Sequence, residues 1–331
     1  MKILFIGGTG TISMAITRLL IEKNEDLYLI NRGNHNQELT NKVHSLHADI
    51  NDERKVKELI KDLSFDCVVD FIAYKKEDIE RDYRLFKDKT KQYIFISSAS
   101  AYQKSPKSLI VKEDTPLENP FWEYSRNKIA CENLLHQYMK EGFPVTIVRP
   151  SHTYDERRIP TCIHGNNGSY QVLKRIIDGK AVIIHDDGQS LWTLTFNQDF
   201  AKGFIGLIGN KKAINETYHI TSDESLTWNQ IYQIIANCLN KELKVFYVPT
   251  KELAKSKIYD LEGNLLGDKA NSMKFDNSKI KSISPDFICT TPFVKGAKIA
   301  IDNILANPEY QKEDPEFDAW CDEIISSGII S

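Results

Sequence analysis

The sequence lacks the features that direct a protein to a membrane, a metal ion or a nucleic acid. Its 331 residues hold only six cysteines, which are far apart and form no Cys-x-x-Cys pair. Neither a disulfide framework nor a zinc site is therefore expected, and a reducing, cytoplasmic location is predicted. With 43 Lys and Arg against 46 Asp and Glu, the net charge is −3, so no general positive field attracts nucleic acid or anionic lipid.

Long apolar runs are missing as well. The apolar run at the N-terminus ends at Ile6, which makes it too short for a signal peptide, and no later stretch reaches membrane-spanning length. Internal repeats and low-complexity tracts are also absent. The remaining composition, 41% hydrophobic and 27% charged, is typical of a soluble globular protein with one large or two medium domains.

The first thirty residues are the most informative stretch that is present. The apolar run to Ile6 is followed at once by Gly7-Gly8-Thr9-Gly10, by apolar residues at helical spacing, and by a second strand-like run that ends at Ile30. This order predicts a βαβ unit of the length that binds a dinucleotide. Gly7 permits the tight turn, and Gly10 lets the backbone approach a pyrophosphate at the helix N-terminus. Ser13 replaces the third glycine of that fingerprint and is small enough for close helix–strand packing.

The residues after the second strand bear on the choice of cofactor. In NAD sites an acidic residue here binds the ribose hydroxyls, whereas a basic one accommodates the 2′-phosphate of NADP. Asn31 removes the carboxylate and Arg32 adds a cation, which favours NADP over NAD; a solvated arginine in a loop is the alternative. Further on, Asp49, followed by Ile50, stands where its carboxylate can accept from an adenine amino group.

Strand-like and helix-like segments alternate through the first 150 residues. Asp66–Ala73 is a near-continuous apolar run of the kind buried in parallel sheets, and further strands are expected at Tyr93–Ile96 and Val145–Val148. The alternation predicts an α/β fold with a Rossmann-type, doubly wound parallel sheet. Residues 1–150 are expected to form the NAD(P)-binding domain, with parts of about 188–222 returning to it, and residues 151–331 a smaller α/β substrate-binding domain.

A candidate catalytic group follows the strand Tyr93–Ile96. That strand runs into serines that include Ser98, and ligands bind at the carboxyl ends of strands in open α/β sheets. In the next helix, Tyr124 and Lys128 are four residues apart and share one face. Four such pairs occur in the chain, and they start at Tyr83, Tyr124, Tyr170 and Tyr247. Only the pair at Tyr124 follows a strand that ends in serines, which selects it.

Taken in order, these motifs resemble those of extended short-chain dehydrogenase/reductases. The shared features are the glycine turn, Asp49-Ile50, Ser98, the Tyr124–Lys128 pair, Arg149-Pro150 and Asp187–Ala201. The likeness spans about residues 1–240, and the chain is similar to the NAD-dependent epimerase/dehydratase group, which includes UDP-galactose 4-epimerase. The resemblance implies an NAD(P)-dependent oxidoreductase or isomerase that acts on a carbinol carbon of a sugar or nucleotide sugar.

By this resemblance, Tyr124 is the acid/base, Lys128 holds the cofactor ribose and lowers the tyrosine pKa, and Ser98 hydrogen-bonds the reacting oxygen. A nearby cation fits this role, because a free phenol with a pKa of about 10 is too high for a base at neutral pH. The residues expected at the cofactor are Gly7, Thr9, Gly10, Thr11, Ile12, Asn31, Arg32, Asp49, Ile50, Phe71, Ala73, Tyr124, Lys128 and Pro150. Those expected at the substrate are Ser100, His152, Tyr154 and Trp192.

Two departures from the group's pattern bear on the reaction and the substrate. Where its dehydratases place an Asp-Glu pair after the serine, this chain has Ala99 and Ser100, which argues against a dehydratase. Trp192 takes the place of an arginine that binds the substrate diphosphate in UDP-sugar epimerases, and an indole stacks on a ring but carries no charge. The alternatives are a core tryptophan at Trp192 and a structural histidine at His152.

Three functions stay open. Epimerisation of a sugar or nucleotide sugar through a transient ketone is the leading hypothesis, and an NADP-dependent reductase of a small carbonyl compound is the next. The third is a non-catalytic RNA-binding or regulatory protein, since the chain also resembles chloroplast stem-loop-binding proteins in its degenerate glycine turn. The negative net charge and the complete Ser-Tyr-Lys set disfavour nucleic acid as a partner. A small-molecule partner is expected, and a homodimer is an open alternative.

Overall fold

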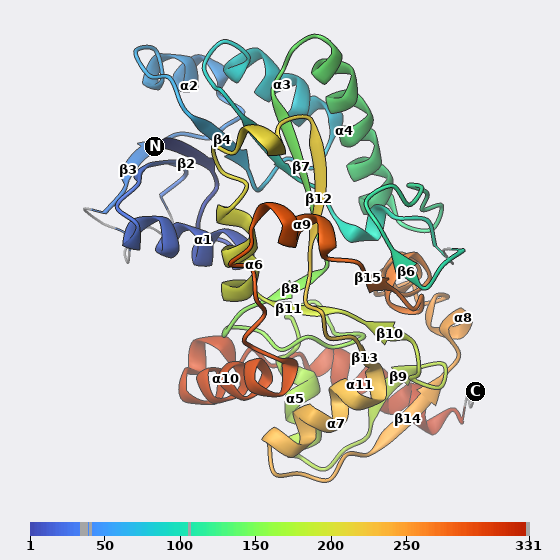
Figure 1. The fold of residues 1–331 in the computed structure, drawn as a ribbon. Coiled ribbons are helices and arrows are strands. Elements are labelled where there is room, and N and C mark those ends of the chain that lie inside the picture. The colour runs from blue at the N-terminus through green and yellow to red at the C-terminus, as the bar shows by residue number, and fades with distance from the viewer. Residues whose placement is uncertain (34–38, 40–41, 105–106, 329–331) are drawn as a thin grey trace.

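A parallel sheet of seven strands forms the centre of the molecule in the computed structural model, which describes residues 1–33, 39, 42–104 and 107–328. The strand order is β12-β7-β5-β4-β1-β2-β3, and every neighbouring pair is parallel. The strands are β1 (Lys2–Ile6), β2 (Asp26–Asn31), β3 (His44–His47), β4 (Cys67–Asp70), β5 (Tyr93–Ile96), β7 (Val145–Pro150) and β12 (Glu216–Ile220). The predicted doubly wound α/β fold is confirmed (Figure 1).

Helices cover both faces of this sheet (Figure 1). Because alternate residues of a strand point to opposite faces, Ile3 and Phe5 of β1 belong to one core cluster and Leu4 and Ile6 to another. The first cluster includes residues of α1 (Thr11–Glu22) and α6 (Asn197–Ile205), and the second includes residues of α2 (Glu53–Leu59), α3 (Lys76–Phe86) and α4 (Glu123–Lys140). Burial on both faces explains why these strands form unbroken apolar runs in the sequence.

The glycine turn lies where the strand order reverses. β1 has β2 on one side and β4 on the other. From β1 the chain adds β2 and β3 on one side, and it then crosses to the other side of β1 to add β4, β5 and β7. In open α/β sheets, ligands bind in the crevice that such a reversal opens at the carboxyl edge. The turn Gly7–Gly10, the loop after β4 and the serines after β5 therefore share one edge of the sheet.

Most of the second half of the chain forms a smaller body next to that edge (Figure 1). Its short strands pair in two-stranded sheets, β8 with β11, β9 with β14, β10 with β13, and β15 with β6 from the first half. These strands are β6 (Ile110–Val111), β8 (His152–Tyr154), β9 (Val182–His185), β10 (Leu191–Trp192), β11 (Leu194–Phe196), β13 (Leu226–Thr227), β14 (Val245–Val248) and β15 (Lys274–Phe275). Trp228 and Tyr232, both fully buried, belong to the separate core of this body.

The helices of the second half complete the fold. They are α5 (Tyr170–Ile177), α7 (Trp228–Cys238), α8 (Thr250–Leu253), a π-helix η4 (Glu262–Lys269), α9 (Ser278–Ile283), α10 (Phe293–Ala306) and α11 (Pro315–Ser326). Short 3-10 turns lie at η2 (Ala99–Ala101), η3 (Lys211–Ala213) and η5 (Pro308–Tyr310). α6, β12 and α9 belong to the large sheet and its covering, so the chain returns there after forming part of the smaller body.

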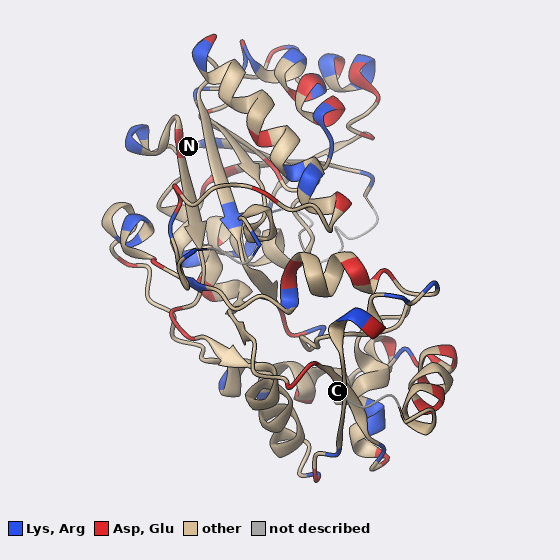
Figure 2. Cartoon of the chain, turned by 90° about the vertical axis from the view of Figure 1, so that its right-hand side faces the viewer, with Lys and Arg blue, Asp and Glu red and all other residues tan. Residues whose placement is uncertain are grey.

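Figure 2 shows both signs of charge interspersed along the outer helices, whereas the strands of the large sheet are mostly uncharged. In the described part of the chain, no helix is long and apolar enough to cross a membrane. Nor is any group of three or more His, Cys, Asp or Glu side chains in that part arranged to hold a metal ion.

Candidate active site

The turn after β1 has the backbone of an anion-binding site. Gly7 and Gly8 have φ angles of 98° and 99°, in the left-handed region that favours glycine. A Cβ on Gly8 would come within 2.7 Å of Leu29 Cδ2, so this position also needs glycine for space. Gly10 precedes the first turn of α1, in which no side chain caps the helix and no acidic residue lies. Apart from the N–H of Gly10, which donates to Ser13 Oγ, the N–H groups of this helix start are therefore available to an anion.

A groove of about 970 Å³ runs from this turn toward the second half of the chain. Residues 7–13, Phe71, Ile72 and Ile96 line it on the sheet side, and the opposite lining includes Arg157, Arg158 and Lys312. Pockets that enclose drug-sized ligands measure about 300–1,000 Å³. The size of the groove, its glycine cradle and its backbone donors fit a nicotinamide dinucleotide.

Ser13 supports the turn in place of a third glycine. Its side chain is buried, and its Oγ accepts a hydrogen bond from the N–H of Gly10 at 2.9 Å. One turn later, the hydroxyl of Thr17 donates to the carbonyl oxygen of Gly8 at 2.8 Å. The replacement thus keeps the close helix–strand packing and adds hydrogen bonds that fix the turn.

The other residues expected at the cofactor divide into two groups. Thr9, Thr11, Ile12 and Phe71 line the groove. Those after β2 and β3 lie outside its lining: Asn31 Oδ1 accepts from the N–H of Gly33 at 2.9 Å, Arg32 and Asp49 are exposed, and Ile50 is buried. The preference for NADP that was inferred from Asn31 and Arg32 stays a prediction.

Ser98, Tyr124 and Lys128 meet at the carboxyl edge of the sheet. Ser98 and Tyr124 line the same cavity, and α4 presents Tyr124 and Lys128 one turn apart. The Lys128 ammonium is buried and donates to the carbonyl oxygens of Ala73 at 2.7 Å and Ile96 at 2.8 Å. Ala73 follows β4 and Ile96 ends β5, so the lysine joins two neighbouring segments between the groove and the cavity.

The protonation of Tyr124 is set by burial rather than by Lys128. Burial raises the pKa of Tyr124 to about 12, and a hydrogen bond with Ser98 opposes this only in part. The ammonium of Lys128 lies 5.8 Å from the centre of the phenol ring, and burial lowers the pKa of the lysine. The expected lowering of the tyrosine pKa is not found in this structure, because the ammonium is directed at two carbonyls. Tyr124 is therefore protonated at neutral pH, as a general acid requires.

The cavity beside Tyr124 has a volume of about 200 Å³. Of the residues expected at the ligands, Ser100, Pro150, His152 and Trp192 line it together with the tyrosine. Burial holds the pKa of His152 at about 3, so this ring is neutral at physiological pH. The side chain of Trp192 is 7% exposed, and its buried indole N–H has no hydrogen-bond partner among the described residues.

The structure does not bring Tyr154 to the cavity. It lies two residues beyond His152 in β8, where its ring packs against Phe196 and Phe293 in the core of the second half. A Cβ on Gly296 would lie 2.0 Å from the Tyr154 hydroxyl oxygen. The phenol of Tyr154 therefore fits against α10 only because residue 296 is a glycine. The position of Tyr154 in this core gives no support to a role in substrate binding.

Sequence reasoning missed several residues that line the same cavity: Trp122, Thr193, Asp268, Met273 and Phe275. Asp268 is the penultimate residue of the π-helix η4 and forms a buried ion pair with Lys104, with Nζ and Oδ1 3.3 Å apart. Burial raises the pKa of Asp268 and lowers that of Lys104. The glycines of η4 that pack on Trp122, Gly263 and Gly267, are the one local signal that marks this segment.

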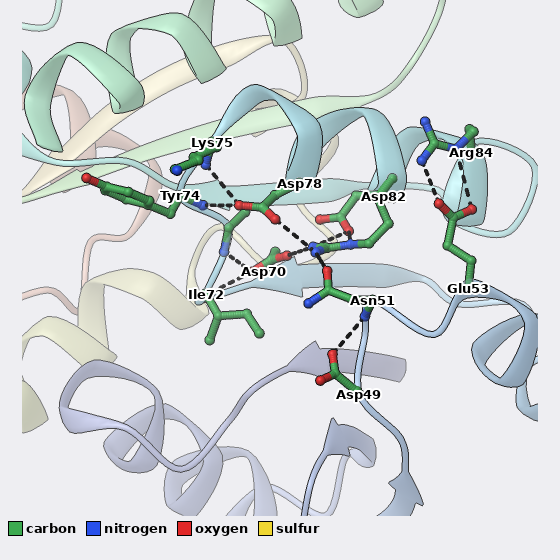
Figure 3. A network of polar contacts seen from close by, with 12 residues as sticks. Asp49, Asn51, Glu53, Asp70, Ile72, Tyr74, Lys75, Asp78, Asp82 and Arg84 are labelled. Carbon is green, nitrogen blue, oxygen red and sulfur yellow. Dashed lines mark hydrogen bonds and ion pairs between the residues drawn. The ribbon is translucent and has the colours of Figure 1, made fainter. Parts of the chain in front are cut away.

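A buried network supports the loop between the groove and Lys128 (Figure 3). Asp70 ends β4, and its Oδ1 accepts from the N–H groups of Ile72 at 2.6 Å and Ala73 at 2.7 Å. Its Oδ2 lies 3.3 Å from the guanidinium of Arg81, which pairs with two further aspartates. Since the carbonyl of Ala73 accepts from Lys128, Asp70 fixes the loop that orients the lysine.

The fold and this edge define a doubly wound α/β protein of the dinucleotide-binding class. A family model described as the NAD dependent epimerase/dehydratase family matches residues 3–221. The chain belongs to this family, which confirms the family expected from its motifs.

Two curated relatives and one solved structure illustrate the similarity. The chain is 25% identical over 248 residues to the chloroplast stem-loop binding protein of 41 kDa b from Arabidopsis thaliana. The matched region covers 71% of this chain and 62% of that protein. The chain is also 28% identical over 168 residues to the UDP-glucose 4-epimerase of Lactobacillus helveticus. Here the matched region covers 45% of this chain and 51% of the epimerase. The chain thus spans between about half and three fifths of these relatives' lengths.

Among solved structures, the UDP-glucuronic acid 4-epimerase of Bacillus cereus in complex with NAD has a TM-score of 0.71 with this chain. The two are 20% identical, and the similarity covers 92% of this chain and 96% of the epimerase chain. At this identity the likeness establishes the fold.

Proposed function

We propose that the protein is an NAD(P)-dependent enzyme that acts on a carbinol carbon through Ser98, Tyr124 and Lys128, with epimerisation of a sugar or nucleotide sugar as its leading reaction. The observation that carries the proposal is the meeting of Ser98 and Tyr124 in one cavity, with Lys128 between that cavity and the glycine groove. The similarity to a UDP-glucose 4-epimerase supports the leading reaction.

Tyr124 moves the proton of the reacting hydroxyl. In the reductive step the protonated phenol donates its proton to the ketone oxygen as that oxygen gains negative charge, and it becomes a phenolate. In the oxidative step the phenolate takes the proton of the reacting hydroxyl as the hydride leaves the carbon. Ser98 holds the same oxygen, and its hydroxyl is hydrogen-bonded to Ser100 Oγ at 2.9 Å, which accepts from Ser125 at 2.8 Å. A bound nicotinamide supplies the hydride and, when oxidised, a positive ring that favours the phenolate.

Replacement of the phenol hydroxyl tests the assignment. Tyr124→Phe is expected to lower kcat about 10²–10⁴-fold, the usual contribution of a general acid/base. Tyr83→Phe is the matched control, because Tyr83 also precedes a lysine by four residues but donates to Glu141 on the surface at 3.0 Å. The assignment fails if Tyr124→Phe keeps more than about a tenth of wild-type turnover.

Epimerisation and reduction differ in whether cofactor is consumed. Turnover with only a catalytic amount of bound cofactor supports an epimerase, whereas loss of NADPH absorbance in step with product identifies the reductase. Calorimetric titration with NAD and with NADP, on the wild type and on Arg32→Ala, measures the cofactor preference. A tighter complex with NADP that depends on Arg32 is the expected result.

A non-catalytic RNA-binding function is the second candidate, because a relative covering 71% of the chain is named a stem-loop binding protein. Phosphate contacts predict an affinity for RNA that falls steeply with salt. Filter binding of a structured RNA over a range of salt concentrations measures this. Absence of retention at low salt excludes the candidate, and retention that Tyr124→Phe leaves unchanged favours it.

A further inference from the structure

The cavity beside Tyr124 is small for the ligand that the family's UDP-sugar enzymes take. Its volume of about 200 Å³ lies below the range of about 300–1,000 Å³ found for pockets that enclose drug-sized molecules. Sugar rings are smaller than such molecules, whereas a sugar joined to a nucleoside diphosphate is larger. The volume beside the tyrosine therefore matches a single sugar ring and is smaller than a sugar joined to a nucleotide.

The wall that limits the cavity is a fixed part of the fold. The π-helix η4 packs so closely on Trp122 that a Cβ on Gly263 would lie 2.1 Å from Trp122 Cδ1. Asn119 donates to the carbonyl oxygens of Ser100 at 2.8 Å and Gly267 at 2.6 Å, which ties η4 to the serine loop. These contacts hold the η4 side of the cavity in place.

The charges around the cavity also disfavour a diphosphate. Among the described residues that line it, none is Lys or Arg, and the one carboxylate is Asp268. Lys104 is committed to Asp268, and the buried ammonium of Lys269 donates to the carbonyl oxygens of Thr161 and Cys162 at 3.1 and 2.9 Å. His152 is neutral. A diphosphate buried here would have no cation to offset its desolvation.

We propose that the substrate is an uncharged sugar or cyclic polyol of monosaccharide size, bound without a nucleotide. This inference rests on the proposed function, since it takes the cavity as the place of the reaction. The apolar face of the ring packs on an indole of the wall, Trp122 or Trp192. The reacting hydroxyl meets Ser98 and Tyr124, and a second hydroxyl donates to the carboxylate of Asp268.

Calorimetry of the protein saturated with NAD tests the substrate class. The probes are D-glucose, D-galactose, myo-inositol, UDP and UDP-glucose. At least one of the three uncharged probes is expected to bind with a Kd near or below about 1 mM, and UDP and UDP-glucose at least tenfold more weakly. Binding of UDP or UDP-glucose more tightly than all three, or binding of none of the three, overturns the proposal.

Variants of the ion pair test the assigned hydroxyl site. Asp268→Asn is expected to weaken binding of the uncharged probe about tenfold, because a charge-assisted hydrogen bond is lost. Since this variant leaves the Lys104 ammonium buried without its partner, Lys104→Met/Asp268→Asn is measured beside it. Undiminished binding by the folded double variant contradicts the role of Asp268.

Hydride transfer is followed separately, by nicotinamide absorbance after each probe is added. An uncharged probe that binds in the cavity without Tyr124-dependent hydride transfer overturns the proposed function and leaves the substrate class standing. Turnover of UDP-glucose that depends on Tyr124 would be the opposite result. It supports the proposed function and overturns the proposed substrate class.

Discussion

The groove and the cavity are built in opposite ways, and Lys128 is close to both, since its ammonium donates to Ile96 of the groove lining and lies 5.8 Å from the ring of Tyr124 in the cavity. The contiguous residues 7–13 supply one wall of the groove, with glycines that leave space and with the start of α1. The cavity is lined by side chains from distant segments, among them Ser98, Tyr124, Trp192 and Asp268. A site made of backbone keeps its ligand as long as the turn is kept, whereas a site made of side chains can change its ligand by substitution.

The two sites also differ in charge. The lining of the groove includes the cations Arg157, Arg158 and Lys312 and the carboxylate of Glu309. Arg157 is paired with Asp155, so it is Arg158, Lys312 and the positive end of α1 that suit an anionic ligand. The smaller cavity has one carboxylate, already paired with Lys104. This difference separates an anionic cofactor from an uncharged substrate. Two substitutions, Lys128→Met and Gly10→Ala, test how far the two sites are independent, and a change of pH tests the support of the cavity wall.

Lys128→Met breaks the connection between the two sites and has the largest expected effect. Methionine leaves the buried carbonyls of Ala73 and Ile96 without the Lys128 donor, which costs about 1–3 kcal/mol for each acceptor, and it removes the ammonium that lies 5.8 Å from the centre of the phenol ring. We expect turnover to fall about 10²–10³-fold and cofactor binding to weaken about tenfold. Steady-state kinetics and calorimetry with NAD measure both quantities.

Lys87→Met is the control for this substitution. Lys87 belongs to the exposed pair with Tyr83, its ammonium lies 5.5 Å from that ring, and it takes no part in either site. It should retain wild-type turnover and affinity. Wild-type values for Lys128→Met as well would show that the groove and the cavity do not depend on this lysine.

The contrast between the two sites also decides what the sequence could predict. The glycine turn and the Tyr124–Lys128 spacing are local, and the strands are unbroken apolar runs, so the fold and the family were predicted correctly. Asp268 reaches the cavity only because η4 packs on Trp122, and no pattern near it indicates that contact. Tyr154 was placed at the substrate because the strand pattern does not reveal the slot opened by Gly296.

The sequence also does not predict the direction in which the pKa of Tyr124 is shifted. Helical spacing places a lysine one turn from the phenol, but it does not show where the ammonium points or how deeply the ring is buried. Both are tertiary properties, and burial dominates here. A local pattern thus identifies the chemical groups, and the packing around them sets their protonation.

Acidification is expected to weaken the support of the cavity wall, with a smaller effect than the loss of Lys128. His185 in β9 is 1% exposed, and its Nε2 is hydrogen-bonded to Ser190 Oγ at 3.0 Å, which in turn donates to the carbonyl of Lys269 at the end of η4. Burial lowers the pKa of His185 to about 4. Because this lies below the ordinary value of about 6.5, the unfolded chain binds more protons, and stability is lost as the pH falls from about 6.5 toward 4.

At about pH 5 the contribution of His185 to this loss is about 2 kcal/mol. Denaturant unfolding of the wild type and of His185→Gln across this range measures it, and the variant should show the shallower dependence on pH. Parallel curves for wild type and His185→Gln would mean that His185 is not held neutral in the folded protein.

Gly10→Ala separates cofactor binding from folding and has the smallest expected effect. Its Cβ would meet only Ser13 Oγ, at 3.6 Å, which is an ordinary contact, whereas Gly8→Ala places a Cβ 2.7 Å from Leu29 Cδ2 in a left-handed backbone. Gly10→Ala should therefore keep the wild-type Tm and weaken NAD binding about tenfold, because the methyl group occupies the approach of the pyrophosphate. Gly8→Ala should lower the Tm instead. If Gly10→Ala binds NAD as tightly as the wild type, the pyrophosphate does not lie on this turn. The groove is then not a backbone-built cofactor site, and the contrast with the cavity built from side chains is wrong.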